Sequence, residues 1–201
     1  MLDSLRVCAI PVRGILDSAL TPGALIDGVP VCGGDEYLAQ LDPQQAAVCI
    51  GVGVMPGNTR RATLVERCTR GGFELIGVVH PSAIIAPRHE FGIGVQVLAG
   101  AVLQGGVRLG NNVIVNTRAS VDHDCVIGHD VMIGPGAVLC GLVSVAAGAY
   151  VGAGAVLMPG VRIGGHAIVG AGCTVTGNVA AGDTVIGNPA RKLDPAETRN
   201  A

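Results

Sequence analysis

A histidine between two aspartates, Asp122-His123-Asp124, is the part of the sequence best suited to chemistry. Histidine takes up and releases protons near neutral pH, and a positioned general base contributes about 10² to 10⁴-fold in rate. An adjacent carboxylate can orient an imidazole ring and make it more basic. A histidine on a protein surface need not have any role, so the elements that position this one decide what it can do.

The chain around this histidine follows a strict six-residue repeat. Apolar residues occupy every sixth position from Val79 to Val175 without a break in register. Helices and ordinary strands have apolar periods of about 3.6 and about 2, so this chain must turn a corner every six residues. Small or β-branched residues at the inward corners and glycine at the bends fit such turns. The repeat predicts a mainly β fold, a parallel β-helix built from hexapeptide repeats.

Three such repeats make one triangular coil, so residues eighteen apart stack directly, separated by about 4.8 Å. The inward-facing positions of the repeat lie two residues before and two residues after His123. The side chain of His123 therefore points outward. Gly141 follows eighteen residues later and leaves a backbone N–H on the same face, suited to polarising a carbonyl group. Ala153 and Ala171, again one coil apart, leave a smooth strip along which an extended ligand can lie. Each of these small residues is also compatible with the repeat alone.

Residues 1–78 follow a different pattern, in which short apolar runs alternate with helical segments, as in a small α/β unit. We predict strands at 12–16, 29–32, 47–52 and 73–79, and helices at 35–41 and 58–70. A nucleotide-binding unit of the Rossmann type opens with a strand and a glycine-rich turn, whereas residues 2–6 read as the end of a first helix. We therefore expect an incomplete Rossmann-like domain, whose native start lies upstream or whose sugar binding is impaired.

The predicted domains are this α/β domain over 1–78, the β-helix over 79–180 and a C-terminal extension over 181–201. The loop after the predicted strand 47–52 carries Gly51, Gly53 and Gly57, which miss the spacing of a dinucleotide fingerprint by one residue. The segment is either an ordinary strand-to-helix loop or one whose backbone N–H groups at Gly51 approach a nucleotide sugar or phosphate.

Composition narrows the classes of partner. The net charge is -2 and there is no basic run, which argues against nucleic acid and gives no reason to expect a membrane surface. No apolar run reaches membrane-spanning length and the start lacks a secretory signal, so we expect a cytoplasmic protein. The seven cysteines are odd in number and form no C-x-x-C pair, which predicts reduced thiols and no metal site.

Several motifs together resemble the bacterial sugar acetyltransferases of sialic-acid and bacillosamine type. They are V-D-H-D-C-V-I-G with the preceding V-N-T, the entry V-V-H-P-S-A, the exit I-G-N-P-A-R-K, and the early G-I-L-D-S and G-V-P-V. The resemblance covers nearly the whole chain. It implies a left-handed β-helix and an acetyl-CoA-dependent homotrimer, with the active site between neighbouring subunits and the nucleotide sugar held by the N-terminal domain.

The resemblance also implies roles for individual residues. His123 matches the family's general base, and Asp124 matches the acidic residue that heightens its basicity. The other matches are a residue lining the cleft, a backbone contact near the thioester, two positions along the coenzyme, and an acidic residue near the uracil: Asn116, Gly141, Ala153, Ala171 and Asp17. Met132 stands where the family commonly has a histidine that contacts acetyl-CoA, and a thioether donates no hydrogen bond.

The leading hypothesis is an acyltransferase that moves the acetyl group of acetyl-CoA to the amino group of a nucleotide-linked sugar, a surface glycan precursor. A sugar O-acetyltransferase of the sialic-acid type stays open, because the sequence does not distinguish an amine from a hydroxyl acceptor. A trimeric scaffold without catalysis also stays open, given Met132 and the missing strand. A zinc enzyme like the gamma-type carbonic anhydrases is a further alternative, although four histidines lack that family's spacing: His89, His123, His129 and His166.

Overall fold

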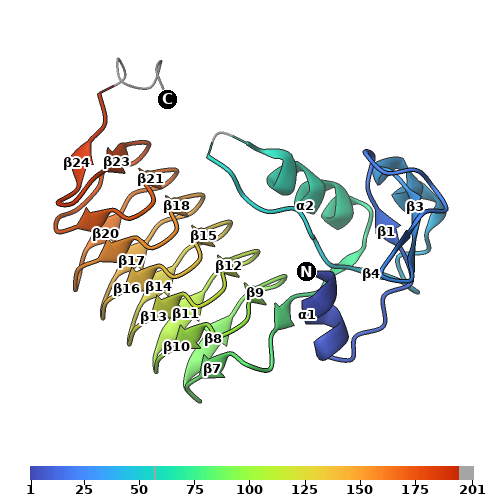
Figure 1. The fold of residues 1–201 in the computed structure, drawn as a ribbon, viewed down its shortest axis with the longest axis horizontal. Coiled ribbons are helices and arrows are strands. Elements are labelled where there is room, and N and C mark those ends of the chain that lie inside the picture. The colour runs from blue at the N-terminus through green and yellow to red at the C-terminus, as the bar shows by residue number, and fades with distance from the viewer. Residues whose placement is uncertain (57, 195–201) are drawn as a thin grey trace. The chain divides into compact units, whose positions relative to one another are not determined.

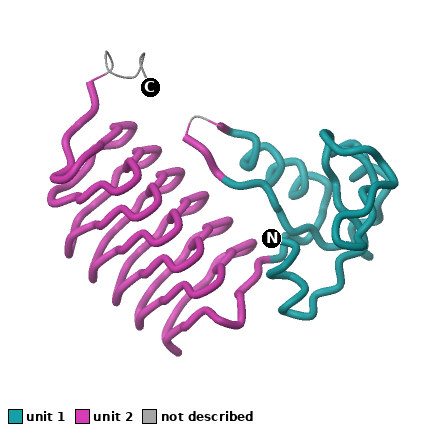
Figure 2. The backbone as a smooth tube through the Cα atoms, viewed as in Figure 1, with its two compact units in different colours: residues 1–53, 59–76 teal, residues 54–58, 77–201 magenta. Residues whose placement is uncertain are grey.

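The computed structural model describes residues 1–56 and 58–194, which form two compact units (Figure 2). The first unit comprises Met1–Gly53 and Thr59–Ile76. The second comprises the described residues of 54–58 and of 77–201. The predicted C-terminal extension therefore lies outside the described residues from position 195 onward.

The second unit is a parallel β-helix, in which three sheets run along the stack of coils (Figure 1). The first sheet contains β7 (Ile84–Ile85), β10 (Val102–Leu103), β13 (Ser120–Val121), β16 (Val138–Leu139), β19 (Val156–Leu157) and β22 (Thr174–Val175). The second contains β8 (His89–Phe91), β11 (Val107–Leu109), β14 (Val126–Ile127), β17 (Ser144–Val145) and β20 (Arg162–Ile163). The third contains β6 (Val78–Val79), β9 (Gln96–Val97), β12 (Ile114–Val115), β15 (Met132–Ile133), β18 (Tyr150–Val151), β21 (Ile168–Val169), β23 (Thr184–Ile186) and β24 (Arg191–Lys192).

The strand register confirms the prediction that residues eighteen apart stack. Leu103 pairs with Val121, and Val121 pairs with Leu139, in parallel ladders. The inward file is fully buried from Val97 to Val169, which confirms the hexapeptide-repeat β-helix. Val79, the first residue of the predicted file, is instead 42% exposed. The prediction of an inward Val79 was wrong, since the buried cluster of the coils begins only at Val95.

The stack closes at its other end with a hairpin. β23 pairs in parallel with β21, and β24 then pairs antiparallel with β23. The chain thus leaves the six-residue repeat after β22 and covers the last coil with a strand of opposite direction. Covering a terminal coil in this way limits the exposed edge that a β-helix would otherwise present.

The first unit holds two helices, one 3₁₀ helix and two small sheets. Its elements are α1 (Leu2–Val7), β1 (Ile15–Leu16), β2 (Leu25–Ile26), β3 (Val29–Gly33), η1 (Asp35–Gln40), β4 (Ala47–Val48), α2 (Arg60–Arg70) and β5 (Glu74–Leu75). One sheet has the order β1-β3-β2 and the other pairs β4 with β5 in parallel. Among the described residues no strand joins the two sheets.

Three predictions for this unit need correction. The segment 35–41 is a 3₁₀ helix rather than an ordinary helix, and the predicted strand 73–79 divides into β5 and β6. The strand β2 was not predicted. It forms a hairpin with β3 across Asp27 and Gly28, which both have positive φ, as a tight two-residue turn requires.

The described residues meet neither the requirements of a membrane-spanning helix nor those of a metal site. Among the residues described, no helix is long and apolar enough to cross a bilayer. Within the same residues, no group of three or more histidine, cysteine and acidic side chains is arranged to hold a metal ion.

The buried thiol of Cys125, at an inward corner of the β-helix, should make the stability of the fold depend on pH. Burial raises the pKa of the Cys125 thiol from 9.0 to about 11, and its S–H donates to the carbonyl of Cys140 at 3.2 Å. The unfolded chain therefore releases this proton first as the pH rises, so the thiol stabilises the fold fully below pH 9 and loses this effect through about pH 11. We expect wild-type stability to fall between pH 8 and 10.5 by about 2 kcal/mol more than that of Cys125→Ala.

Urea unfolding at the two pH values measures this difference. Burial also raises the thiol pKa of Cys49, Cys68 and Cys173, which lower stability at high pH in both proteins and cancel in the comparison. Alanine is the matched replacement because it already occupies equivalent corners such as Ala119 and Ala137. An identical pH dependence of the two proteins would contradict the assignment.

Candidate active site

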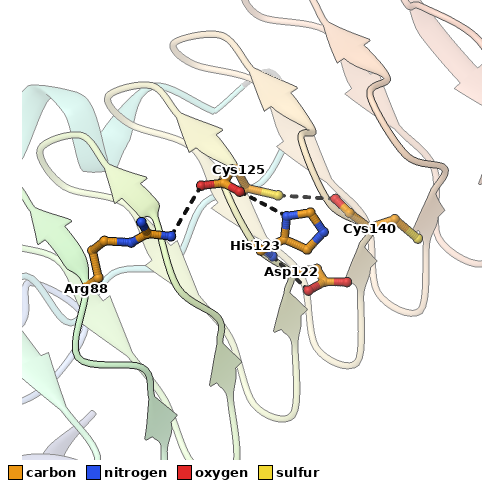
Figure 3. A network of polar contacts seen from close by, with 6 residues as sticks. Arg88, Asp122, His123, Cys125 and Cys140 are labelled. Carbon is orange, nitrogen blue, oxygen red and sulfur yellow. Dashed lines mark hydrogen bonds and ion pairs between the residues drawn. The ribbon is translucent and has the colours of Figure 1, made fainter.

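The corner between β13 and β14 carries Asp122, His123 and Asp124. Figure 3 shows Asp122 and His123 with the polar contacts around them. The apolar residues on either side, Val121 and Cys125, are fully buried, and His123 is exposed and projects outward as predicted. Asp124 has a φ of 57°, a left-handed conformation that turns the chain sharply at this point. The His123 side chain is 57% exposed and thus open to a substrate.

Both aspartates hold His123, but they hold different parts of it. Asp122 Oδ1 accepts the backbone N–H of His123 at 2.7 Å. Asp124 Oδ2 lies 3.0 Å from His123 Nδ1. Since a carboxylate only accepts hydrogen bonds, Nδ1 must carry the proton in this contact, and the lone pair of the neutral ring is on Nε2. The arrangement presents Nε2 as a proton acceptor.

Gly141 lies directly against this nitrogen, one coil further along. A Cβ atom at position 141 would overlap His123 Nε2 and lie 2.7 Å from Cε1. The backbone joins the two coils here, because Leu142 N–H donates to the carbonyl of His123 at 2.9 Å. The base nitrogen and the bare backbone of Gly141 therefore face the same small space.

The other predicted residues of the β-helix lie elsewhere on the coils. Asn116, Ala153 and Ala171 follow strands of the third sheet, β12, β18 and β21, and so lie at a different corner from His123. Asn116 Oδ1 accepts the Thr117 N–H at 2.7 Å. Met132, in β15, is 8% exposed. Within one chain, His123, Asp124 and Gly141 lie close together. The other four predicted residues of the β-helix lie apart from them: Asn116, Met132, Ala153 and Ala171.

The two predicted substrate residues of the first unit both follow parallel strands. Asp17 comes directly after β1, donates its backbone N–H to the Gly33 carbonyl at 2.8 Å and caps Ala19 N–H with Oδ1 at 2.8 Å. Gly51 lies in the loop after β4. Ligands of α/β sheets commonly bind at such carboxyl ends of strands. Gly57, the last glycine of that loop, lies outside the described residues.

The start of α2 supports these loops in a way that the sequence reading missed. Arg61 is 3% exposed, and its Nη1 donates to the carbonyls of Ile50 and Val52 at 2.9 and 2.6 Å. Its neighbour Arg60 lies 3.4 Å from Ser18 Oγ. The buried guanidinium thus fixes the backbone around Gly51. A helix that begins with two arginines was the available signal.

An open pocket of about 380 Å³ lies beside Asp124 on the β-helix. It is lined by Pro87, Arg88, His89, Glu90, Gly106, Val107, Arg108 and Asp124. Arg88 reaches Asp124 Oδ1 at 3.8 Å, so it belongs to the same polar network as His123 (Figure 3). Arg88 was not predicted as part of the site.

This corner of the β-helix combines a candidate general base, His123, with a backbone donor for a developing oxyanion, two groups that acyl transfer can use. Residues 108–141 match the family described as bacterial transferase hexapeptide (six repeats). Known structures extend the likeness to the rest of the chain.

Three solved structures illustrate this likeness. The acetyltransferase domain of PglB from Neisseria gonorrhoeae, in complex with acetyl coenzyme A, is 34% identical, with a TM-score of 0.88 over 95% of this chain and 91% of that one. PerB from Caulobacter crescentus, in complex with CoA and GDP-perosamine, is 36% identical, with a TM-score of 0.88 over 96% and 90%. WeeI from Acinetobacter baumannii is 32% identical, with a TM-score of 0.80 over 89% and 84%. The chain belongs to the hexapeptide-repeat sugar acetyltransferases, and it is an acyltransferase.

Proposed function

We propose that the protein transfers the acetyl group of acetyl-CoA to the amino group of a nucleotide-linked amino sugar, with His123 as general base. The observation that carries this proposal is the contact of His123 Nδ1 with Asp124, which leaves Nε2 beside Gly141. The solved neighbours support the substrate classes, because PglB is in complex with acetyl coenzyme A and PerB with CoA and GDP-perosamine. Solved structures of the Caulobacter enzyme also include two variants in which one histidine is replaced, by asparagine or by alanine.

In the proposed reaction the sugar amine attacks the thioester carbonyl carbon, so a C–N bond forms and the C–S bond breaks. His123 Nε2 accepts the proton that the amine loses, and Asp124 stabilises the resulting imidazolium. The Gly141 N–H donates to the oxygen that becomes negative during the attack. His123 then returns the proton to the departing sulfur of CoA. Each proton transfer uses groups of this one corner.

The distribution of the remaining residues supports a trimeric enzyme. Asn116, Ala153 and Ala171 lie at a different corner of the coils from His123. A homotrimer of parallel prisms would place that corner of one subunit beside the His123 corner of the next, where both could line one coenzyme site. We propose this assembly, with Asp17 and Gly51 contributing to the nucleotide sugar, and a reaction in the cytoplasm.

Direct assay tests the function. Purified protein is mixed with acetyl-CoA and either GDP-perosamine or a UDP-linked amino sugar, while release of the CoA thiol is followed. We expect turnover with at least one acceptor and a product that carries one acetyl group on nitrogen, identified by NMR. An ester product would identify an O-acetyltransferase instead. Absence of CoA binding at millimolar concentration in calorimetric titration would favour a scaffold.

Asp124→Asn tests the orienting carboxylate. Asparagine keeps the shape of the side chain, but its amide can donate to Nδ1 and so move the ring proton to Nε2, the atom that must be free to accept. We expect kcat to fall by about tenfold or more, with the KM for acetyl-CoA nearly unchanged. Steady-state kinetics at saturating acceptor measures the effect.

Asp122→Asn is the matched control, because an asparagine oxygen can still accept the His123 backbone N–H. Its kcat should stay close to the wild-type value. Equal losses in both variants would mean that the aspartates act through the backbone of the corner and not through the imidazole.

A further inference from the structure

One column of the β-helix runs through Arg88, Gly106 and Asp124, which are eighteen residues apart and lie on successive coils. A backbone hydrogen bond joins the first two of these coils, since Gly106 N–H donates to the Arg88 carbonyl at 2.6 Å. Arg88 and Asp124 are therefore two coils apart. Only a long side chain can bridge that span, and the Arg88 guanidinium does so, with Nη2 at 3.8 Å from Asp124 Oδ1 (Figure 3).

Gly106 provides the room for this bridge. A Cβ atom at position 106 would overlap Asp124 Oδ1 and approach its Cγ to 3.1 Å. The φ of Gly106 is +83°, a conformation that side chains rarely adopt. The carboxylate of Asp124 thus lies over the bare backbone of the middle coil, with Arg88 on the far side of it.

The two oxygens of Asp124 have separate partners. Oδ1 faces Arg88, whereas Oδ2 contacts His123 Nδ1 at 3.0 Å. The Asp124 side chain is 48% exposed, and each of its two oxygens has one of these contacts. A cation held on Oδ1 favours the rotamer that keeps Oδ2 on the imidazole.

We propose that Arg88 is a positioning residue, which holds the Asp124 carboxylate in the orientation that fixes the His123 ring for acetyl transfer. This inference rests on the proposed function of His123. Arg88 acts through Asp124 and is not assigned a contact with the substrate. Its side chain is 80% exposed, and exposed ion pairs contribute little, so its effect is modest.

A double-mutant cycle tests the proposal. Arg88→Gln should lower kcat by about two- to fivefold with unchanged KM values for acetyl-CoA and acceptor. In an Asp124→Asn background the same change should have no further effect, because the carboxylate through which Arg88 acts is absent. Arg88→Lys keeps the charge and should recover part of the loss. An effect of full size in the Asp124→Asn background would overturn the proposal.

Arg108→Gln is the matched control. Arg108 lines the same pocket, but in register it stands opposite Glu90 on the neighbouring strand and forms no ion pair with Asp124 among the described residues. We expect its kcat to remain near the wild-type value. An equal loss in this variant would mean that the general positive charge of the pocket matters and not the bridge. A raised acceptor KM for Arg88→Gln with unchanged kcat would make Arg88 a substrate-binding residue and would also overturn the proposal.

A readout without turnover separates this inference from the proposed function. Nitrogen-15 NMR of the His123 ring, in the free full-length protein at a pH where the ring is neutral, reports which nitrogen carries the proton. Wild type should show the proton on Nδ1, and Arg88→Gln should shift part of the population to Nε2, while Arg108→Gln should not. Unchanged ring signals in Arg88→Gln would refute the positioning role, whatever acceptor the enzyme uses.

Discussion

Replacing His123 with alanine is expected to lower kcat by at least about a hundredfold, because the variant has no group that can accept the proton of the attacking amine. The KM for acetyl-CoA should change little, since the imidazole transfers protons in the chemical step and is assigned no part in binding the coenzyme. The effect is measured by thiol release from acetyl-CoA with the acceptor identified for the wild-type protein. His123→Gln should be impaired to a similar degree, because an amide is not a base at neutral pH.

The control for His123→Ala is the assembly and fold of the variant. The side chain is 57% exposed and outside the buried core, so its removal should leave the thermal unfolding temperature and the sedimentation behaviour nearly unchanged. Near-normal turnover in a variant with these properties would remove His123 from the mechanism. A loss of turnover together with a loss of assembly would be resolved by His123→Gln, which keeps a polar side chain of similar size.

The sequence predicted the β-helix and the outward position of His123 because a repeat protein is nearly one-dimensional. The backbone of each coil pairs with that of its neighbours, so the register of Val121 and Cys125 suffices to orient the residue between them. The same arithmetic predicted that Gly141 lies one coil beyond His123. It also implies that Ala153, twelve residues after Gly141, lies at another corner, as the structure shows.

The α/β unit was less predictable, because its strands are short and its sheets small. Most of its strands have only two residues, too few for an alternating pattern to define their ends. The hairpin of β2 and β3 had a usable signal in Asp27 and Gly28, a pair typical of a two-residue turn. The support of the Gly51 loop by Arg61 depends on burial of a charged side chain, which the two arginines at the start of α2 do not by themselves indicate.

Arg88 escaped prediction for a different reason. Stacking arithmetic compares residues one coil apart, whereas Arg88 and Asp124 are two coils apart. Their contact depends on the length of the arginine side chain and on the absence of a side chain at Gly106. A search for long charged residues separated from an acidic residue by one glycine in the same column would have found it.

Gly141→Ala is expected to lower kcat by about ten- to a hundredfold, although the change adds only one methyl group. The new Cβ would overlap His123 Nε2 and lie 2.7 Å from Cε1, so the imidazole must move away from the position it holds beside Asp124. A displacement of a catalytic group by about 1 Å can cost about 10²-fold in rate. The methyl group would also narrow the space in which we propose that the Gly141 N–H donates to the thioester oxygen. Steady-state kinetics measures the loss.

Gly105→Ala provides the matched comparison for this prediction. Gly105 occupies the same column as Gly141, one coil before His123 instead of one coil after it, and a Cβ there would meet only Arg88 Nη2, at 3.8 Å. The methyl group therefore fits without displacing the ring, and kcat should stay near the wild-type value. A crystal structure of Gly141→Ala should show the imidazole rotated off Asp124 Oδ2. Wild-type kcat in that variant would mean that the base nitrogen does not work in the space beside Gly141, and the oxyanion contact would have to be sought elsewhere on the coil.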